Sequence, residues 1–264
     1  MKLFFLSTLQ LTTIAGITQS IREPISNTFT FLSNPGALAH CIQMDIALYT
    51  EKRFQLRELN FSSAKVAIPV RSDAVGLIMS YGGYEEYNES QLAVAYGKNL
   101  GKIDIGAQFN YNMLRIAGFG SDVAMTAEIG TIWHLNDKTH FSLLIVNPGA
   151  GGFRKDHQET LASAYSVGIG YEYSPEFIFN AEIVKTEDKP VNIHIEMQYN
   201  LSAQFLARLG LSTDTSTPWF GAGWKWKNIQ AVIISSYHPQ LGISSGLELV
   251  FYGKDKKDDT IEIN

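Results

Sequence analysis

Residues 191–201 read VNIHIEMQYNL, and this stretch decides the fold. Every odd-numbered position from 191 to 201 is apolar, and every even-numbered position between them is polar. Successive side chains of an extended strand point to opposite faces, so this segment has one apolar and one polar face. The same alternation recurs in four further windows, and a helical period fits none of them: these windows are 103–113, 121–135, 165–173 and 220–227.

The alternation predicts about fourteen strands, an even number that is usual for single-chain bacterial barrels. Many of these segments are longer than the five or six residues typical of strands in globular proteins. They match the ~9–11 tilted residues that a β-strand needs to cross a bilayer. The expected fold class is therefore all-β, a transmembrane antiparallel β-barrel over residues 42–253. The expected strands are 42–50, 58–68, 74–81, 89–98, 102–114, 121–135, 138–146, 161–173, 176–185, 190–201, 203–213, 218–227, 229–238 and 241–252.

The links between these strands and the positions of the aromatic residues favour the same fold. Every second link is tight, as at 98–102 and 136–137, whereas most of the others are longer, as at 82–88, 115–120 and 147–160. Short turns on one rim and longer loops on the other are typical of outer-membrane barrels. Aromatic residues gather near strand ends, as interfacial girdles do: they are Tyr171, Tyr173, Trp219, Trp224, Trp226, Tyr237, Phe251 and Tyr252.

Composition excludes several classes of protein. The chain has 264 residues, of which 45% are apolar and 18% charged, with a formal net charge of −5 and one cysteine. The apolar share is too high for a disordered chain, and the negative charge argues against a nucleic-acid partner. In residues 1–20, Met1-Lys2 is followed by a short apolar run, which predicts a signal peptide, with a buried first strand or helix as the alternative. We therefore expect the cell outer membrane as the location and membrane lipid as a partner.

The polar face of the expected strands would line the lumen. Interior carboxylates paired with lysine and arginine are the favoured interpretation, and an acidic passage is the alternative. His194 and Glu196 are two residues apart, but two donors without a third do not make a metal site, so we expect no metal and no cofactor. The expected lumen-lining residues are Asp104, Glu128, Glu172, Glu182, His194, Glu196, Arg208, Lys225 and Glu248.

No catalytic motif is visible in the sequence. The glycine-rich stretch 147–152 lacks the Lys-Ser/Thr that completes a phosphate-binding loop, so it is better interpreted as an external loop. No Ser/His/Asp spacing rises above chance, so we expect a protein that is not an enzyme.

Residues 21–41 precede the first expected strand and contain Asn34-Pro35-Gly36, a combination that forces a turn. A short segment of small residues at this place predicts an N-terminal hatch inside the barrel. Asn-Pro followed by small residues and Leu-Ala, before a barrel of about fourteen strands, resembles the hatch of the FadL-like outer-membrane family. The resemblance extends to the PorV- and PorQ-type barrels of Bacteroidota. Residues 254–264 are expected to form a charged periplasmic tail.

Two functions follow from this resemblance. The short hatch, the short loops and the tail favour an accessory subunit similar to the PorV-type components of type IX secretion, with other outer-membrane or periplasmic proteins as partners. The alternative is a passive channel for small hydrophobic or polar solutes, which the family resemblance and the acidic inner face would suit.

Overall fold

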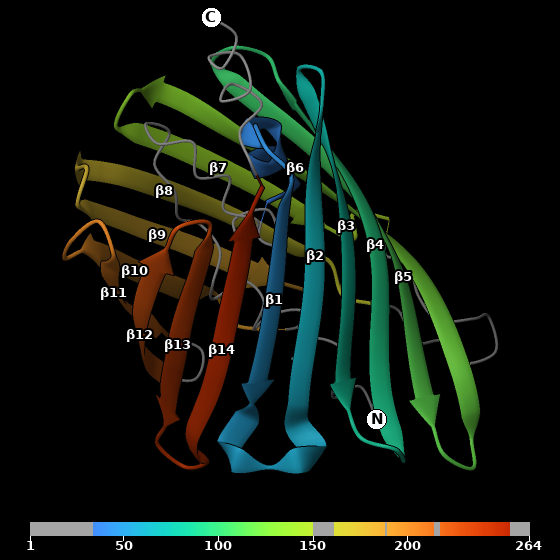
Figure 1. Cartoon of the computed structure of the whole chain (residues 1–264). Helices are drawn as coiled ribbons and strands as arrows, with labels where there is room; N and C mark the ends of the chain where they lie inside the picture. The colour runs from blue at the N-terminus through green and yellow to red at the C-terminus, as the bar shows by residue number, and fades with distance from the viewer. Residues whose placement is uncertain (1–33, 150–160, 188, 214–216, 254–264) are drawn as a thin grey trace, which may run out of the picture.

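The computed structural model describes residues 34–149, 161–187, 189–213 and 217–253, and its strands form a closed antiparallel barrel (Figure 1). This confirms the fold class that the alternation predicts. The strands are β1 (Asp45–Lys52), β2 (Asn60–Val70), β3 (Asp73–Gly83), β4 (Tyr87–Asn99), β5 (Ile103–Ile116), β6 (Gly120–Asn136), β7 (Thr139–Val146), β8 (Ala164–Ser174), β9 (Phe177–Thr186), β10 (Asn192–Asn200), β11 (Phe205–Ser212), β12 (Thr217–Trp226), β13 (Ile229–His238) and β14 (Gly242–Tyr252).

Each strand pairs with its neighbours in the chain, and β1 closes the barrel against β14. The closing register runs from Asp45 opposite Tyr252 to Lys52 opposite Ser245. Closure matters because an unpaired backbone N–H or C=O costs several kcal/mol in hydrocarbon, so a sheet that spans a membrane needs a partner for every strand.

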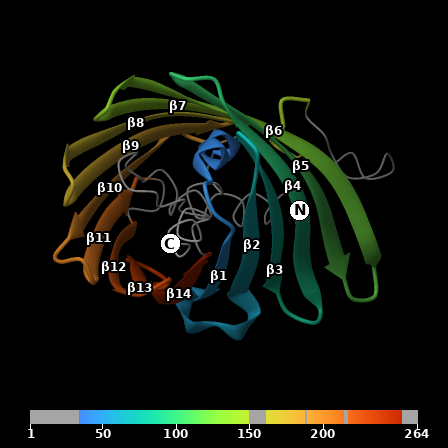
Figure 2. The same cartoon turned by 45° about the horizontal axis from the view of Figure 1, so that its top comes forward.

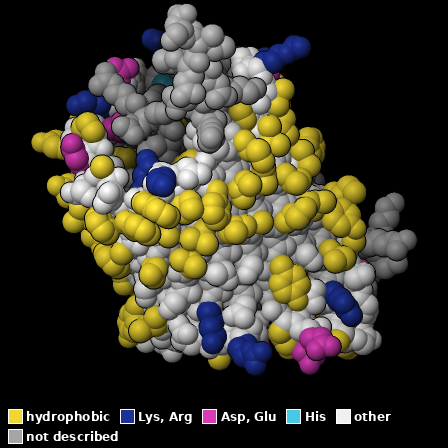
Figure 3. All heavy atoms as spheres, viewed as in Figure 1, with side chains coloured by type: hydrophobic (Ala, Val, Ile, Leu, Met, Phe, Trp, Pro, Cys, Tyr) yellow, Lys and Arg dark blue, Asp and Glu magenta, His cyan; other side chains and the backbone are white. Residues whose placement is uncertain are grey.

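The two faces of the wall differ as the alternation requires. On β13, Ile233 is 65% exposed while its neighbour Val232 is completely buried. On β11, Leu209 points outward and is exposed, while Arg208 points inward and is buried. Figure 3 shows the result on one side of the barrel, where apolar side chains form a band across the outer face and charged side chains lie towards the rims. An apolar outer band is what lipid contact demands of such a barrel.

Two details differ from the sequence-based expectation. The links at 84–86 and 117–119 are tight, because β3 to β6 continue past the predicted strand ends. The longest links, at 53–59 and 147–163, do lie on the same rim, because they follow the odd-numbered strands β1 and β7.

The aromatic residues differ from the expectation in part. Trp219 and Tyr252 are buried and point inward, so they are not part of an outer girdle. Trp224 and Trp226 are exposed and stacked on each other.

A 3-10 helix, η2 (Pro35–His40), lies inside the ring of strands (Figure 2). It packs against β3, β4, β5 and β6. Two further short helices, η3 (Arg53–Gln55) and η4 (Arg57–Leu59), form the link between β1 and β2. Within the described part of the chain, no helix has the length and apolar character of a membrane span. The predicted signal peptide and charged tail, and residues 21–33 of the predicted hatch, lie outside the described residues.

Candidate functional site: the inner wall and its hatch

The helix η2 begins at a cap that its sequence supplies. Asn34 is the N-cap residue, and its Oδ1 accepts a hydrogen bond of 2.8 Å from the backbone N–H of Gly36. Pro35 follows at the first helical position, where its fixed φ suits a helix start and its missing N–H costs nothing. The Asn-Pro-Gly combination therefore starts a helical turn that the wall then holds in place.

The side-chain amide of Asn34 also attaches η2, the described part of the segment predicted as a hatch, to the wall. Its Nδ2 donates to the backbone carbonyl of Thr131 on β6 and to that of Leu143 on β7, both at 3.2 Å. Asn34 is almost fully buried, and a buried polar side chain stays favourable only when its donors and acceptors are paired. One amide thus caps η2 and holds it against two strands.

Three glycines on neighbouring strands make room for η2. Gly97 on β4 lies opposite Gly106 on β5, which lies opposite Gly130 on β6, and we call these three residues the glycine row. A Cβ atom on Gly106 would lie 2.2 Å from the carbonyl carbon of Pro35. A Cβ on Gly97 would lie 2.7 Å from the backbone nitrogen of Ala39. The glycine row is therefore a recess in the inner wall that only residues without a side chain can form.

An apolar cluster holds the far end of the hatch. Leu38 and Cys41 pack against small residues of β2, β3 and β4, among them Ala67 and Ala74. Cys41 is a free cysteine, and its thiol donates to the backbone carbonyl of Gln43. Burial, reinforced by the nearby Asp45 carboxylate, raises the pKa of the Cys41 thiol to about 12. Cys41 is thus a buried, protonated thiol, and its burial depends on η2 staying packed against the wall.

The lumen-lining residues predicted from the sequence all lie on the inward face. Asp104, Glu128, Glu172, Glu182, Glu196, Arg208 and Glu248 are buried, and His194 and Lys225 are half-buried.

A fully buried charge pair on this face joins β11 to β14. Arg208 donates from Nη1 to Glu248 Oε2 at 3.3 Å and from Nε to Gln198 Oε1 at 2.9 Å. Both charged groups are at most 2% exposed. The arginine passes Gly221 of β12, where an added Cβ would lie 3.4 Å from Arg208 Cβ, an ordinary contact. A buried ion pair of this kind tolerates the loss of neither partner.

Two of the other carboxylates, Glu128 and Glu182, accept hydrogen bonds from neutral groups. Glu128 accepts hydrogen bonds from Asn110 Nδ2 at 2.8 Å and Gln108 Nε2 at 3.2 Å. Glu182 accepts one from the Ser166 hydroxyl and lies opposite His194 in the register. Alternation along each strand sets which side chains point inward, and the register between strands sets which of them are neighbours. Together they account for these contacts.

Glu196 lies opposite Asn180 in the same register, and the ammonium of Lys225 lies 5.8 Å from the centre of the Tyr252 ring. Pairing with lysine and arginine, the favoured sequence-based interpretation, therefore describes Glu248 but not Glu128. The inner wall is therefore a polar surface that combines ion pairs with carboxylates held by neutral donors.

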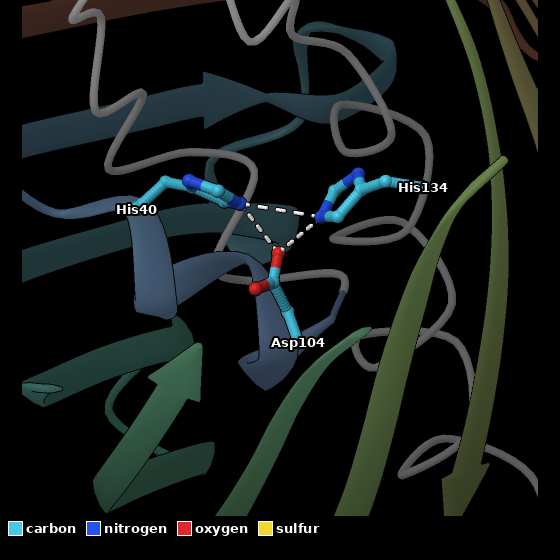
Figure 4. A group of neighbouring side chains, drawn as sticks. All are labelled: His40, Asp104 and His134. Atoms are coloured by element: carbon cyan, nitrogen blue, oxygen red, sulfur yellow. Dashed lines mark hydrogen bonds and ion pairs between the residues drawn. The ribbon is translucent and has the colours of Figure 1, made fainter. Parts of the chain in front are cut away.

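One cluster on the inner wall was missed by the sequence analysis. His40 of η2, Asp104 of β5 and His134 of β6 point towards one another (Figure 4). Asp104 Oδ2 lies 2.5 Å from His40 Nε2 and 2.6 Å from His134 Nε2. The alternation places His134 and Asp104 on the inward face of adjacent strands, and this was the signal available in the sequence. The position of His40, however, depends on how the hatch docks.

No protein-family model matches the sequence, and no curated protein matches it either. Solved structures do resemble the barrel. The barrel has the fold of the FadL-type channels. The toluene transporter TodX of Pseudomonas putida aligns with a TM-score of 0.63 at 10% identity, covering 87% of this chain and 94% of that chain. The Ralstonia pickettii toluene transporter TbuX gives 0.62 at 10% identity over the same shares.

A FadL homologue of Pseudomonas aeruginosa aligns with a TM-score of 0.58 at 9% identity, covering 86% of this chain and 93% of that chain. At these identities the likeness concerns the fold. The finer resemblance to PorV- and PorQ-type barrels stays a prediction.

Proposed function

We propose that this protein is a passive channel of the outer membrane for small hydrophobic solutes, and that it is not an enzyme. The observation that carries the proposal is a hatch seated in a recess of a closed barrel whose fold is shared with toluene transporters. This supports the channel alternative of the sequence analysis over the accessory-subunit hypothesis, which has no support from the structural likeness.

The pairing of polar groups on the inner wall supports a solute of low polarity. The apolar side chains Leu206, Val232 and Val250 also point inward, but they are buried within the wall. Many inward polar groups already have protein partners, as Glu128 and Arg208 do, so they leave an apolar solute free to pass without desolvating them.

Uptake by whole cells tests the proposal. The chain is produced in a Gram-negative host that lacks its own hydrocarbon channel, and the entry of labelled toluene is measured against an empty-vector strain. We expect uptake several-fold above the vector strain at equal surface level. His194→Trp, which adds bulk to the inner wall, should reduce uptake, whereas Ile193→Trp on the outer face of the same strand should not.

Folding of each variant is checked by heat-modifiable gel mobility. Uptake equal to the vector strain from a folded barrel contradicts the proposal. Stoichiometric copurification of a partner protein, without uptake, would return the accessory-subunit hypothesis to first place.

A further inference from the structure

We propose that His40, Asp104 and His134 bind one divalent transition-metal ion, of the class of Zn²⁺, and that this ion joins the hatch to the barrel wall. The three residues come from three separate elements, η2, β5 and β6, and their ligand atoms all lie within 4.8 Å of one another. The inference does not depend on the solute that the channel carries.

The two imidazoles are spaced as zinc ligands are. His40 Nε2 and His134 Nε2 are 3.3 Å apart. Donors about 2.0–2.1 Å from a tetrahedral zinc ion are separated from each other by about 3.3 Å. Asp104 Oδ2 is closer to both nitrogens, at 2.5 and 2.6 Å, so the carboxylate must withdraw by under ~1 Å to admit an ion.

The groups behind these donors fit a metal site as well. Asn99 Nδ2 donates to Asp104 Oδ1 at 2.6 Å, which fixes the carboxylate and leaves Oδ2 facing the two histidines. His134 Nδ1 lies 2.9 Å from His140 Nδ1, and His140 Nε2 lies 3.5 Å from Glu172 Oε1. Metal-binding histidines nearly always donate their second N–H to a hydrogen-bond acceptor that fixes the tautomer, and for His134 the imidazole of His140 takes this place.

The contacts behind His134 are compatible with a bound ion. With a metal on His134 Nε2, the Nδ1–H of His134 donates to His140 Nδ1, and the remaining N–H of His140 faces the Glu172 carboxylate.

The donor set selects the kind of ion. Two imidazoles and one carboxylate suit zinc, copper, nickel or iron(II), whereas calcium and magnesium prefer sets of oxygen atoms. Three protein donors leave one coordination position open. Because His40 belongs to η2 while Asp104 and His134 belong to the wall, an ion bound here holds the hatch in the docked position and opposes its release.

Metal binding by the purified, tag-free barrel tests the site. The protein is stripped with a chelator, Zn²⁺ alone is added, and the bound metal is measured by elemental analysis and calorimetry. We expect one ion per chain, and an affinity at least tenfold weaker in His40→Gln and in His134→Gln. His194→Gln and His238→Gln are matched controls on β10 and β13 and should bind as the wild type does, as should Cys41→Ser.

A second readout tests the link between hatch and wall. The alkylation rate of Cys41, which adjoins η2, should fall several-fold when Zn²⁺ binds the wild-type chain and stay constant in His40→Gln. His40→Gln lies outside the strands, so the barrel can fold without it. No zinc on the wild-type barrel, or equal affinity in His40→Gln, overturns the site. Zinc binding that leaves Cys41 alkylation unchanged overturns the joining role.

Discussion

Substitution of Gly106 by alanine tests the docked hatch most directly. The added Cβ would lie 2.2 Å from Pro35 C, 2.3 Å from Pro35 O and 2.4 Å from Gly36 N, where ordinary contact begins at 3.4 Å. These atoms are backbone, so no side chain can rotate away. The helix η2 has to move off the wall by at least about 1 Å, because close-packed interiors leave no slack of that size.

Overpacking of this kind costs about 1–3 kcal/mol, which corresponds to an undocked hatch about 5 to 150 times more populated. The single cysteine of the chain reports this population. Cys41 packs beside Leu38 of η2 and is buried while the hatch is docked. The rate of Cys41 alkylation in Gly106→Ala should therefore rise by the same factor of about 5 to 150.

Gly221→Ala is the matched control, because Gly221 also lies on the inner wall but its added Cβ would make only ordinary contacts of 3.4–3.7 Å. Alkylation in this variant should stay at the wild-type rate, and its stability should not fall, since alanine is favoured over glycine inside a strand. If Gly106→Ala folds, as judged by gel mobility, and its Cys41 reacts within about twofold of the wild-type rate, far below the rise that overpacking predicts, the glycine row is not the seat of the hatch.

Three further predictions follow from single side chains. The Cys41 thiol, with its pKa raised to about 12, stays protonated through pH 10, so the rate of its reaction with a small thiol reagent should keep rising with pH up to pH 10. A rate that levels off at about pH 8.5, the ordinary thiol pKa, would mean that Cys41 is solvated. Glu248→Gln leaves the Arg208 charge buried without its partner and should cost about 3–5 kcal/mol in urea unfolding from lipid bilayers, part of which Arg208→Met in the same chain should restore; additive losses would disprove the pair. Ile233→Arg on the outer face should cost about 2–4 kcal/mol in the same assay while Ile233→Leu is neutral, and a neutral Ile233→Arg would place this face away from lipid.

Strand positions could be predicted well because each strand carries its own signal. Alternation along 229–238 gives the bounds of β13 to the residue, and the first strand, where the alternation is weaker, is displaced by two to three residues. The inward parity of all nine predicted lumen residues follows from the same period of two.

Features that join several strands could not be predicted in this way. The glycine row needs the register of β4, β5 and β6 at once, and a single glycine within a strand gives no hint of its neighbours. Trp219 was assigned to an outer girdle because it is near a strand end. It lies two residues from Gly221 on the same strand, so both residues face inward. The His40 cluster required the hatch to be docked, and docking is a tertiary event that no local pattern encodes.

The pairing of β1 with β14 has a consequence for how the molecule is made. The first strand of the wall acquires its second neighbour only after residue 252 has been synthesised, so every shorter nascent chain carries two open edges. Such edges template association between chains. Biogenesis must therefore keep the polypeptide apart from its copies until translation has passed the final strand, and a stalled or clipped product lacking that strand should accumulate as aggregate rather than insert.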